Sequence, residues 1–139
     1  MANESAYMKR TPLRRRSKSE LAKLKDRLWE LCKQLTRKVH GYNCYTCGAH
    51  CEAPHTGHFI TDSTCSTELS YSLDNLRPQC YRCNIHLSGN WVVFEANLIR
   101  DNGQEWVDSL KKRNQATKGL QYDSLWYINK IAEYEALLR

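Results

Sequence analysis

Two Cys-x-x-Cys pairs constrain this 139-residue chain more than any other feature of its sequence. The pairs, Cys44–Cys47 and Cys80–Cys83, are separated by residues 48–79. Two residues between thiols let both sulfur atoms of a tight turn bind one tetrahedral ion, and Gly48 allows the left-handed backbone that ends such a turn. The pairs predict a structural zinc held by all four cysteines, with unligated or redox-active thiols as the alternative.

The remaining cysteines, Cys32, Cys51 and Cys65, are surplus to this zinc and are expected to be core or partly exposed thiols. Cys51 or His55 could replace one ligand, although neither lies in a paired turn. The total of 7 cysteines is odd, which argues against a complete disulfide framework. The first residues, Met-Ala-Asn-Glu-Ser, lack the layout of a secretory signal, so a reducing, cytoplasmic location is expected.

The composition is that of a globular protein, with 41% hydrophobic and 26% charged residues. The longest apolar run, Trp91-Val92-Val93-Phe94, is far shorter than the ~20 residues that span a bilayer. No membrane partner is therefore expected. Length favours one compact domain with helical attachments.

Positive charge is concentrated at the N-terminal end. Residues 1–43 carry 12 Lys/Arg against 4 Asp/Glu, whereas the rest of the chain has a small excess of acidic residues. A basic arm over residues 1–18, with Arg14, Arg15, Arg16 and Lys18 as candidate DNA-binding residues, suggests contact with nucleic acid. The alternative is a solvated basic tail.

Hydrophobic periodicity predicts helices on both sides of the cysteine-rich region. An amphipathic basic helix is expected over 19–40, where leucines recur at steps of three and four, and it should pack on its own domain rather than form a dimer seam. Further helices are expected at about 91–100, 104–114 and 124–138, with a break at Asn102-Gly103. These patterns divide the chain into an arm (1–18), a helix (19–40), a core (41–114) and a C-terminal helical part (115–139).

The cysteine pairs are part of a longer pattern. Gly57-His58-Phe59 lies between them, and Gln79-Cys80-x-x-Cys83-Asn84-x-His86-x-Ser88-Gly89-Asn90 follows. Over about residues 42–110 this pattern resembles the NinG/Rap recombination endonucleases of lambdoid phages. The resemblance implies an α+β fold with a zinc-braced, HNH-like ββα-metal core. It also implies cleavage of branched DNA, such as Holliday junctions and D-loops, inside a bacterial host.

Phosphodiester hydrolysis requires a base to deprotonate water and positive charge beside the leaving oxygen. His58 is the candidate base, and Asn84 is the candidate ligand of a catalytic Mg²⁺ or Mn²⁺. Asn75 matches the middle Asn of the HNH pattern, and the resemblance implies that it orients the site by tying its loop to the strand that carries the base. Many HNH enzymes carry Asp or His directly before the base, where this chain has Gly57. Further metal ligands could be, in falling order of expectation, His86, Asn90 and His55, and phosphate could be bound by Arg77 and Arg82.

The leading hypothesis is a metal-dependent DNA endonuclease. The alternative from another class is a non-catalytic zinc module that binds nucleic acid, and a protein adaptor with a zinc-stapled core is a third. His58 with Asn84 favours the enzyme, because a binding module needs neither a base nor a hard-metal ligand. A single small site cuts one strand at a time, so symmetric cleavage of a junction would require a homodimer.

Overall fold

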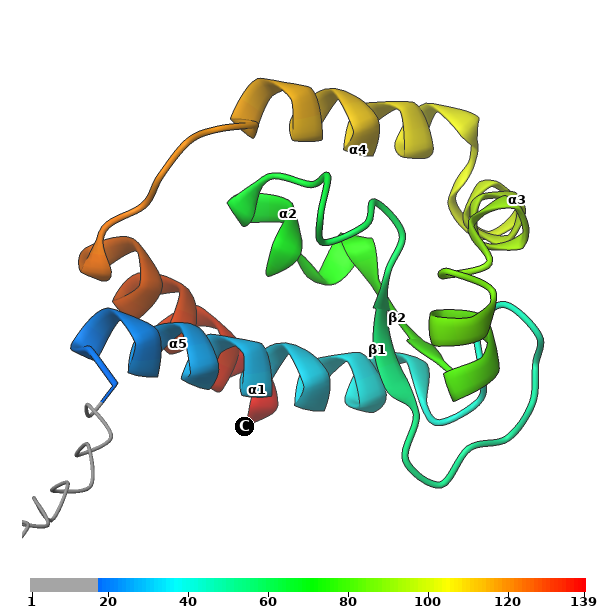
Figure 1. Cartoon of the computed structure of the whole chain (residues 1–139), viewed down its shortest axis with the longest axis horizontal. Helices are drawn as coiled ribbons and strands as arrows, with labels where there is room; N and C mark the ends of the chain where they lie inside the picture. The colour runs from blue at the N-terminus through cyan, green and yellow to red at the C-terminus, as the bar shows by residue number, and fades with distance from the viewer. Residues whose placement is uncertain (1–17) are drawn as a thin grey trace, which may run out of the picture.

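The computed structural model describes residues 18–139, so the arm that contains Arg14, Arg15 and Arg16 lies outside the described residues. The fold is α+β, as predicted. Over residues 18–139, five α-helices and short helical turns surround a two-stranded sheet (Figure 1). Among the described residues, no helix has the length and apolar character needed to cross a membrane.

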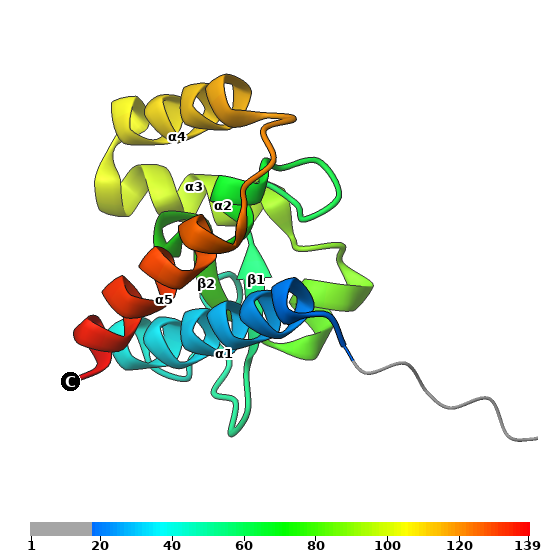
Figure 2. The same ribbon diagram turned by 90° about the vertical axis from the view of Figure 1, so that its left-hand side faces the viewer.

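The first helix, α1 (Glu20–His40), matches the predicted range. The hydroxyl of Ser19 caps it by accepting a hydrogen bond from the backbone amide of Ala22 at 3.2 Å. Leu28, Leu31 and Leu35 are buried on the face that packs along the last helix, α5 (Ser124–Leu138). The predicted apolar stripe therefore packs within its own domain, and Figure 2 shows the two helices side by side.

The sheet is an antiparallel pair of four-residue strands, β1 (His55–His58) and β2 (Leu76–Gln79). His55 pairs with Gln79, and His58 pairs with Leu76. The connection between the strands contains the short helix α2 (Thr67–Ser70) and the 3₁₀ turn η1 (Leu73–Asn75). A five-residue π-helical turn, η2 (Arg82–His86), follows β2 and begins the segment that leads to the next helix.

A second hydrophobic core lies between the segment that connects the two strands and the two helices that follow η2. It is formed by Phe59 and Leu69 with residues of α3 (Trp91–Asn102) and α4 (Gln104–Thr117). The predicted break is present at Gly103, whose φ of 95° turns the chain sharply between these helices. Helix α4 continues three residues past the expected boundary at 114, because Asn114 is buried and its side chain accepts from the amide of Ser66.

Candidate functional site

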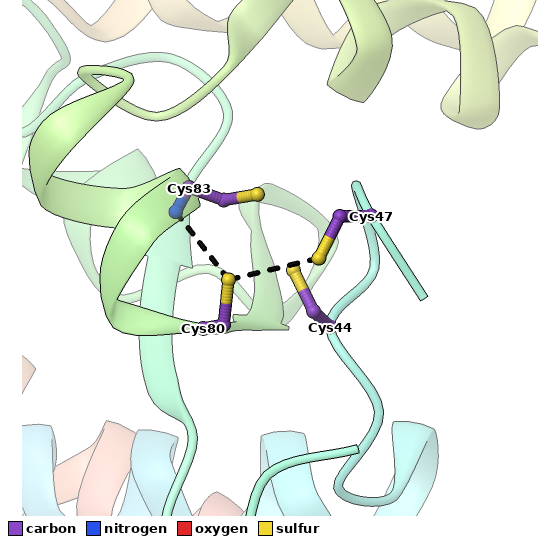
Figure 3. A group of neighbouring side chains, drawn as sticks. All are labelled: Cys44, Cys47, Cys80 and Cys83. Atoms are coloured by element: carbon purple, nitrogen blue, oxygen red, sulfur yellow. Dashed lines mark hydrogen bonds between the residues drawn. The ribbon is translucent and has the colours of Figure 1, made fainter. Parts of the chain in front are cut away.

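The four paired cysteines come together, as predicted, from the turn at residues 44–47 and from residues 80–83 at the start of η2 (Figure 3). All four sulfur atoms lie within 4.8 Å of one another, and those of Cys47 and Cys80 are 3.7 Å apart. Four thiolates at the usual Zn–S distance of about 2.3 Å have sulfur atoms about 3.8 Å apart, which matches the observed spacing. The cluster can hold a metal ion such as zinc.

Hydrogen bonds to sulfur prepare the cluster for a metal. Burial acts to raise the pKa of the Cys44 thiol, but hydrogen bonds from the Thr46 hydroxyl and from nearby backbone amides outweigh it and lower that pKa to about 6. At Cys47 a hydrogen bond from the backbone of Ala49 acts to lower the pKa, but burial and the neighbouring thiols outweigh it and raise that pKa to about 12, so Cys44 is the thiol of this pair that loses its proton first. The backbone amide of Cys83 donates to the sulfur of Cys80 at 3.4 Å. Because thiolates are the metal-binding form of cysteine, these hydrogen bonds favour binding.

The first turn of the cluster ends at Gly48, which has the predicted left-handed conformation (φ 77°). The side chain of Gln79 links the first cysteine turn to the segment that follows η2. Its amide nitrogen donates to the Thr46 hydroxyl at 3.2 Å and to the carbonyl of Gly89 at 2.8 Å. Sequence reasoning missed Gln79, because a polar residue in a short strand gives no sign of being fully buried.

The three surplus cysteines lie outside the cluster. Cys32 is buried in α1, where burial raises the pKa of its thiol to about 12. Cys51 and Cys65 are half-buried. Among the described residues, the four paired cysteines form the only group of three or more Cys, His, Asp or Glu ligands that lie within metal-binding reach.

His58, the predicted base, faces α1. Its ring stacks on Trp29 with centroids 5.2 Å apart, and its Nε2 lies 3.0 Å from the backbone carbonyl oxygen of Ser70. It lines a cavity of about 410 Å³ with residues of α1, α2 and α5. Only 14% of its side chain is exposed, so these contacts hold the ring firmly between β1 and α1.

His55, rather than His58, contacts Asn84. Its Nδ1 lies 3.0 Å from the side-chain nitrogen of Asn84. The two histidines are three positions apart in one strand, so they point to opposite faces of the sheet. The structure therefore brings Asn84 together with the histidine that the sequence ranked last as a further ligand, and places His58 on the other face. Sequence reasoning did not distinguish the two histidines, because the sequence does not show that both lie in one four-residue strand.

Of the two other candidate metal ligands, His86 contacts a neighbour of His55, whereas Asn90 contacts the cysteine cluster. His86 is exposed and makes an edge contact with Tyr81, with ring centroids 5.1 Å apart. The other edge partner of Tyr81 is His55, at 5.6 Å. The amide of Asn90 instead donates to the sulfur of Cys83 at 3.7 Å, which orients it toward the cysteine cluster.

Asn75 is fully buried and ties its loop to the chain that follows β1. Its side-chain oxygen accepts from the amide of Ile60 at 2.8 Å, and its side-chain nitrogen donates to the carbonyls of Ile60 and Leu69. These contacts are of the kind expected of an orienting residue.

The candidate DNA-binding cations differ in exposure. Arg82 is exposed at the start of η2, whereas Lys18 forms an ion pair with Asp26. Arg77 is buried with 6% exposure, and its guanidinium donates to the carbonyls of Leu73, Asp74 and Leu76. This placement argues against the predicted phosphate contact from Arg77, because its charge is used inside the fold to hold the turn before β2.

Comparison with known proteins gives a consistent result. A family model described as "Bacteriophage Lambda NinG protein" matches residues 2–139. "Protein ninG" of Escherichia phage lambda is 31% identical over 101 residues, which cover 69% of this chain and 46% of that protein. "Protein ninG" of Escherichia phage 933W is 35% identical over 72 residues, or 51% and 35% of the two chains. The chain thus spans less than half the length of these curated relatives, and no solved structure matches it.

Proposed function

The chain belongs to the NinG family of lambdoid phage proteins, and from this premise we propose that it is a metal-dependent endonuclease acting on branched DNA such as Holliday junctions and D-loops. The observation that carries the proposal is the contact between His55 and Asn84. Asn84 directly follows Cys83, so a metal in the cysteine cluster would fix η2 and hold Asn84 opposite β1.

The donor atoms of this pair fit a divalent ion. Neighbouring ligands of an octahedral ion lie about 3.0 Å apart when each is 2.0–2.1 Å from the metal. His55 Nδ1 and the Asn84 amide are separated by 3.0 Å, and a half-turn of the amide exchanges its nitrogen for its oxygen. Phosphate oxygens of DNA would complete the coordination. An imidazole ligand suits Mn²⁺ better than Mg²⁺, so we expect Mn²⁺ to support higher activity.

The proposed roles follow from this arrangement. A bound ion would lower the pKa of a coordinated water and offset charge on the phosphate. Asn84 and His55 would hold the ion, and exposed Arg82 on the same turn would attract the phosphate. We assign the acceptance of the water proton to His86, the exposed imidazole on η2, in place of His58. His58 then acts as a packing residue between β1 and α1.

The direct test is cleavage of a synthetic four-way junction with Mn²⁺, with Mg²⁺ and with EDTA. We expect His55→Ala and Asn84→Ala to abolish metal-dependent cleavage and His86→Ala to lower turnover about 10²–10⁴-fold, while DNA binding persists. His50→Ala is a matched control, because His50 also contacts an asparagine, Asn43, at 3.0 Å but is exposed and belongs to neither β1 nor η2. His58→Ala should lower thermal stability while the folded protein still cuts.

Two results would contradict these assignments. Wild-type protein that binds junctions but does not cut them with any divalent ion would favour the non-catalytic zinc module. Full activity in folded His55→Ala, together with its loss in folded His58→Ala, would return the chemistry to His58. The proposed homodimer is checked separately by the mass of the protein–junction complex.

A further inference from the structure

Large apolar side chains are exposed in one short segment beside the His55–Asn84 pair. Residues 81–93 contain Tyr81 (56% exposed), Ile85 (50%), Leu87 (40%), Trp91 (59%), Val92 (62%) and Val93 (38%). Their segment begins at η2 and ends in the first turn of α3, on the side of the sheet away from α5 (Figures 1 and 2). Such a concentration of exposed apolar surface usually marks a contact site.

The backbone holds this segment in an unusual and well-connected shape. Ser88, Gly89 and Asn90 all have left-handed φ values, of 50°, 91° and 47°. The amide of Gly89 donates to the carbonyl of Cys83 at 2.9 Å, and that of Asn90 to the carbonyl of Leu87 at 2.8 Å. These hydrogen bonds anchor the segment to Cys83 of the cysteine cluster, so the backbone that carries its exposed apolar side chains is fixed in place.

Two observations indicate what covers this surface. Tyr81 has edge contacts with both His55 and His86, so a substrate bound at these histidines also meets the segment. Residues 81–94 contain no Asp or Glu and carry Arg82, which suits a polyanionic partner. In an intact duplex the faces of the bases are covered by stacking, whereas at a branch point base faces are exposed or easily unstacked.

We propose that residues 81–93 form an apolar wedge that contacts the exposed base faces at a DNA branch point and so sets the preference for branched over linear DNA. The inference rests on the proposed nuclease function and adds the residues that select its substrate. Phosphate contacts attract both kinds of DNA equally, whereas aromatic and aliphatic side chains gain contacts only where bases are accessible.

The test measures binding without cleavage, in a buffer that lacks Mg²⁺ and Mn²⁺ but contains no chelator, to a four-way junction and to a linear duplex with the same arm sequences. We expect Ile85→Ser and Trp91→Ala each to lower the junction-to-duplex affinity ratio about 10-fold and to leave duplex affinity unchanged. Ile128→Ser is the matched control for Ile85→Ser. Ile128 is about as exposed as Ile85 (49% against 50%) but lies in α5, outside the wedge. Thermal melts establish that each variant is folded.

A second readout uses 2-aminopurine at the branch, whose fluorescence should rise when wild type binds and rise less with the wedge variants. An unchanged affinity ratio in both variants would overturn the wedge, as would wild type that binds junction and duplex equally. Loss of self-association in the variants with an unchanged ratio would make the segment an interface between copies. Because no cleavage is involved, a protein that fails to cut but shows the expected ratios would overturn only the nuclease proposal.

Discussion

Gly57 lies so close to the side chain of Gln79 that a Cβ atom on Gly57 would be 1.9 Å from Gln79 Oε1 and 2.7 Å from Cδ. Gly57 is required here for space rather than for backbone conformation. Any side chain would displace Gln79, whose two hydrogen bonds join the first cysteine turn to the segment that follows η2. This contact gives a physical reason why the position before His58 cannot carry the metal ligand that an HNH-like sequence would lead one to expect.

Gly57→Ala should therefore destabilise the protein by about 1–3 kcal/mol through overpacking and loss of the Gln79 hydrogen bonds. Urea unfolding measures this change. In a Gln79→Ala background the added methyl group has room, so the same substitution should cost much less. Equal costs in the two backgrounds would show that the two side chains do not compete for space.

Features encoded locally were predictable from the sequence. The Ser19 cap and the leucine spacing determine where α1 begins and which face it buries, and two residues between cysteines place both thiols on one ion. The face that each histidine presents was not predictable, because β1 has only four residues and Gly57 interrupts any alternation. Arg77 was expected to be a surface cation, but all four residues of β2 are buried, Arg77 among them. A charged residue in so short a strand gives no sign in the sequence that it is enclosed.

The cysteine cluster gives a prediction about metal and stability. Cys83→Ser should lower the bound zinc measured by atomic absorption and reduce the melting temperature, since metal binding and folding are coupled. Cys65→Ser, outside the cluster, should leave zinc content unchanged and affect stability only slightly. Treatment with a strong chelator should lower the melting temperature of wild type to near that of Cys83→Ser. Full stability of a zinc-free Cys83→Ser protein would exclude a structural metal.

His40 gives a prediction about pH. His40 is an exposed residue, but its side chain lines a small cavity with Leu35 and Leu73. Desolvation there, together with the positive charge of Arg77, lowers the pKa of His40 to about 4, against about 6.5 in an unfolded chain. Between these values the unfolded chain binds more protons, so the stability contributed by neutral His40 is present above pH 6.5 and is lost as the pH falls toward 4. His40→Gln should therefore lose less melting temperature than wild type between pH 7 and about pH 5.

Acid loss of zinc affects both proteins alike, so the difference between their pH profiles isolates His40. His50→Gln, a substitution of another exposed histidine, controls for the change of side chain. Parallel profiles for wild type and His40→Gln would contradict the prediction.

The basic N-terminal arm gives a prediction about DNA affinity. Each lysine or arginine that neutralises a phosphate adds about 0.9 to the slope of log affinity against log salt. Replacing Arg14, Arg15 and Arg16 with Gln should lower the magnitude of that slope by about 3 and weaken binding to any DNA sequence. Fluorescence anisotropy over a salt series measures both quantities.

The cations of α1 provide the matched control. Lys23, Arg27 and Lys33 form ion pairs with Glu20, Glu135 and Glu30, so their charge is already partly offset. Replacing all three with Gln removes as many positive charges as the three arginines of the arm, yet we expect a smaller change in slope, because a phosphate must compete with a carboxylate for each cation. The opposite result, a large change in the α1 variant and none on replacing the three arginines of the arm, would identify α1 as the surface that binds DNA.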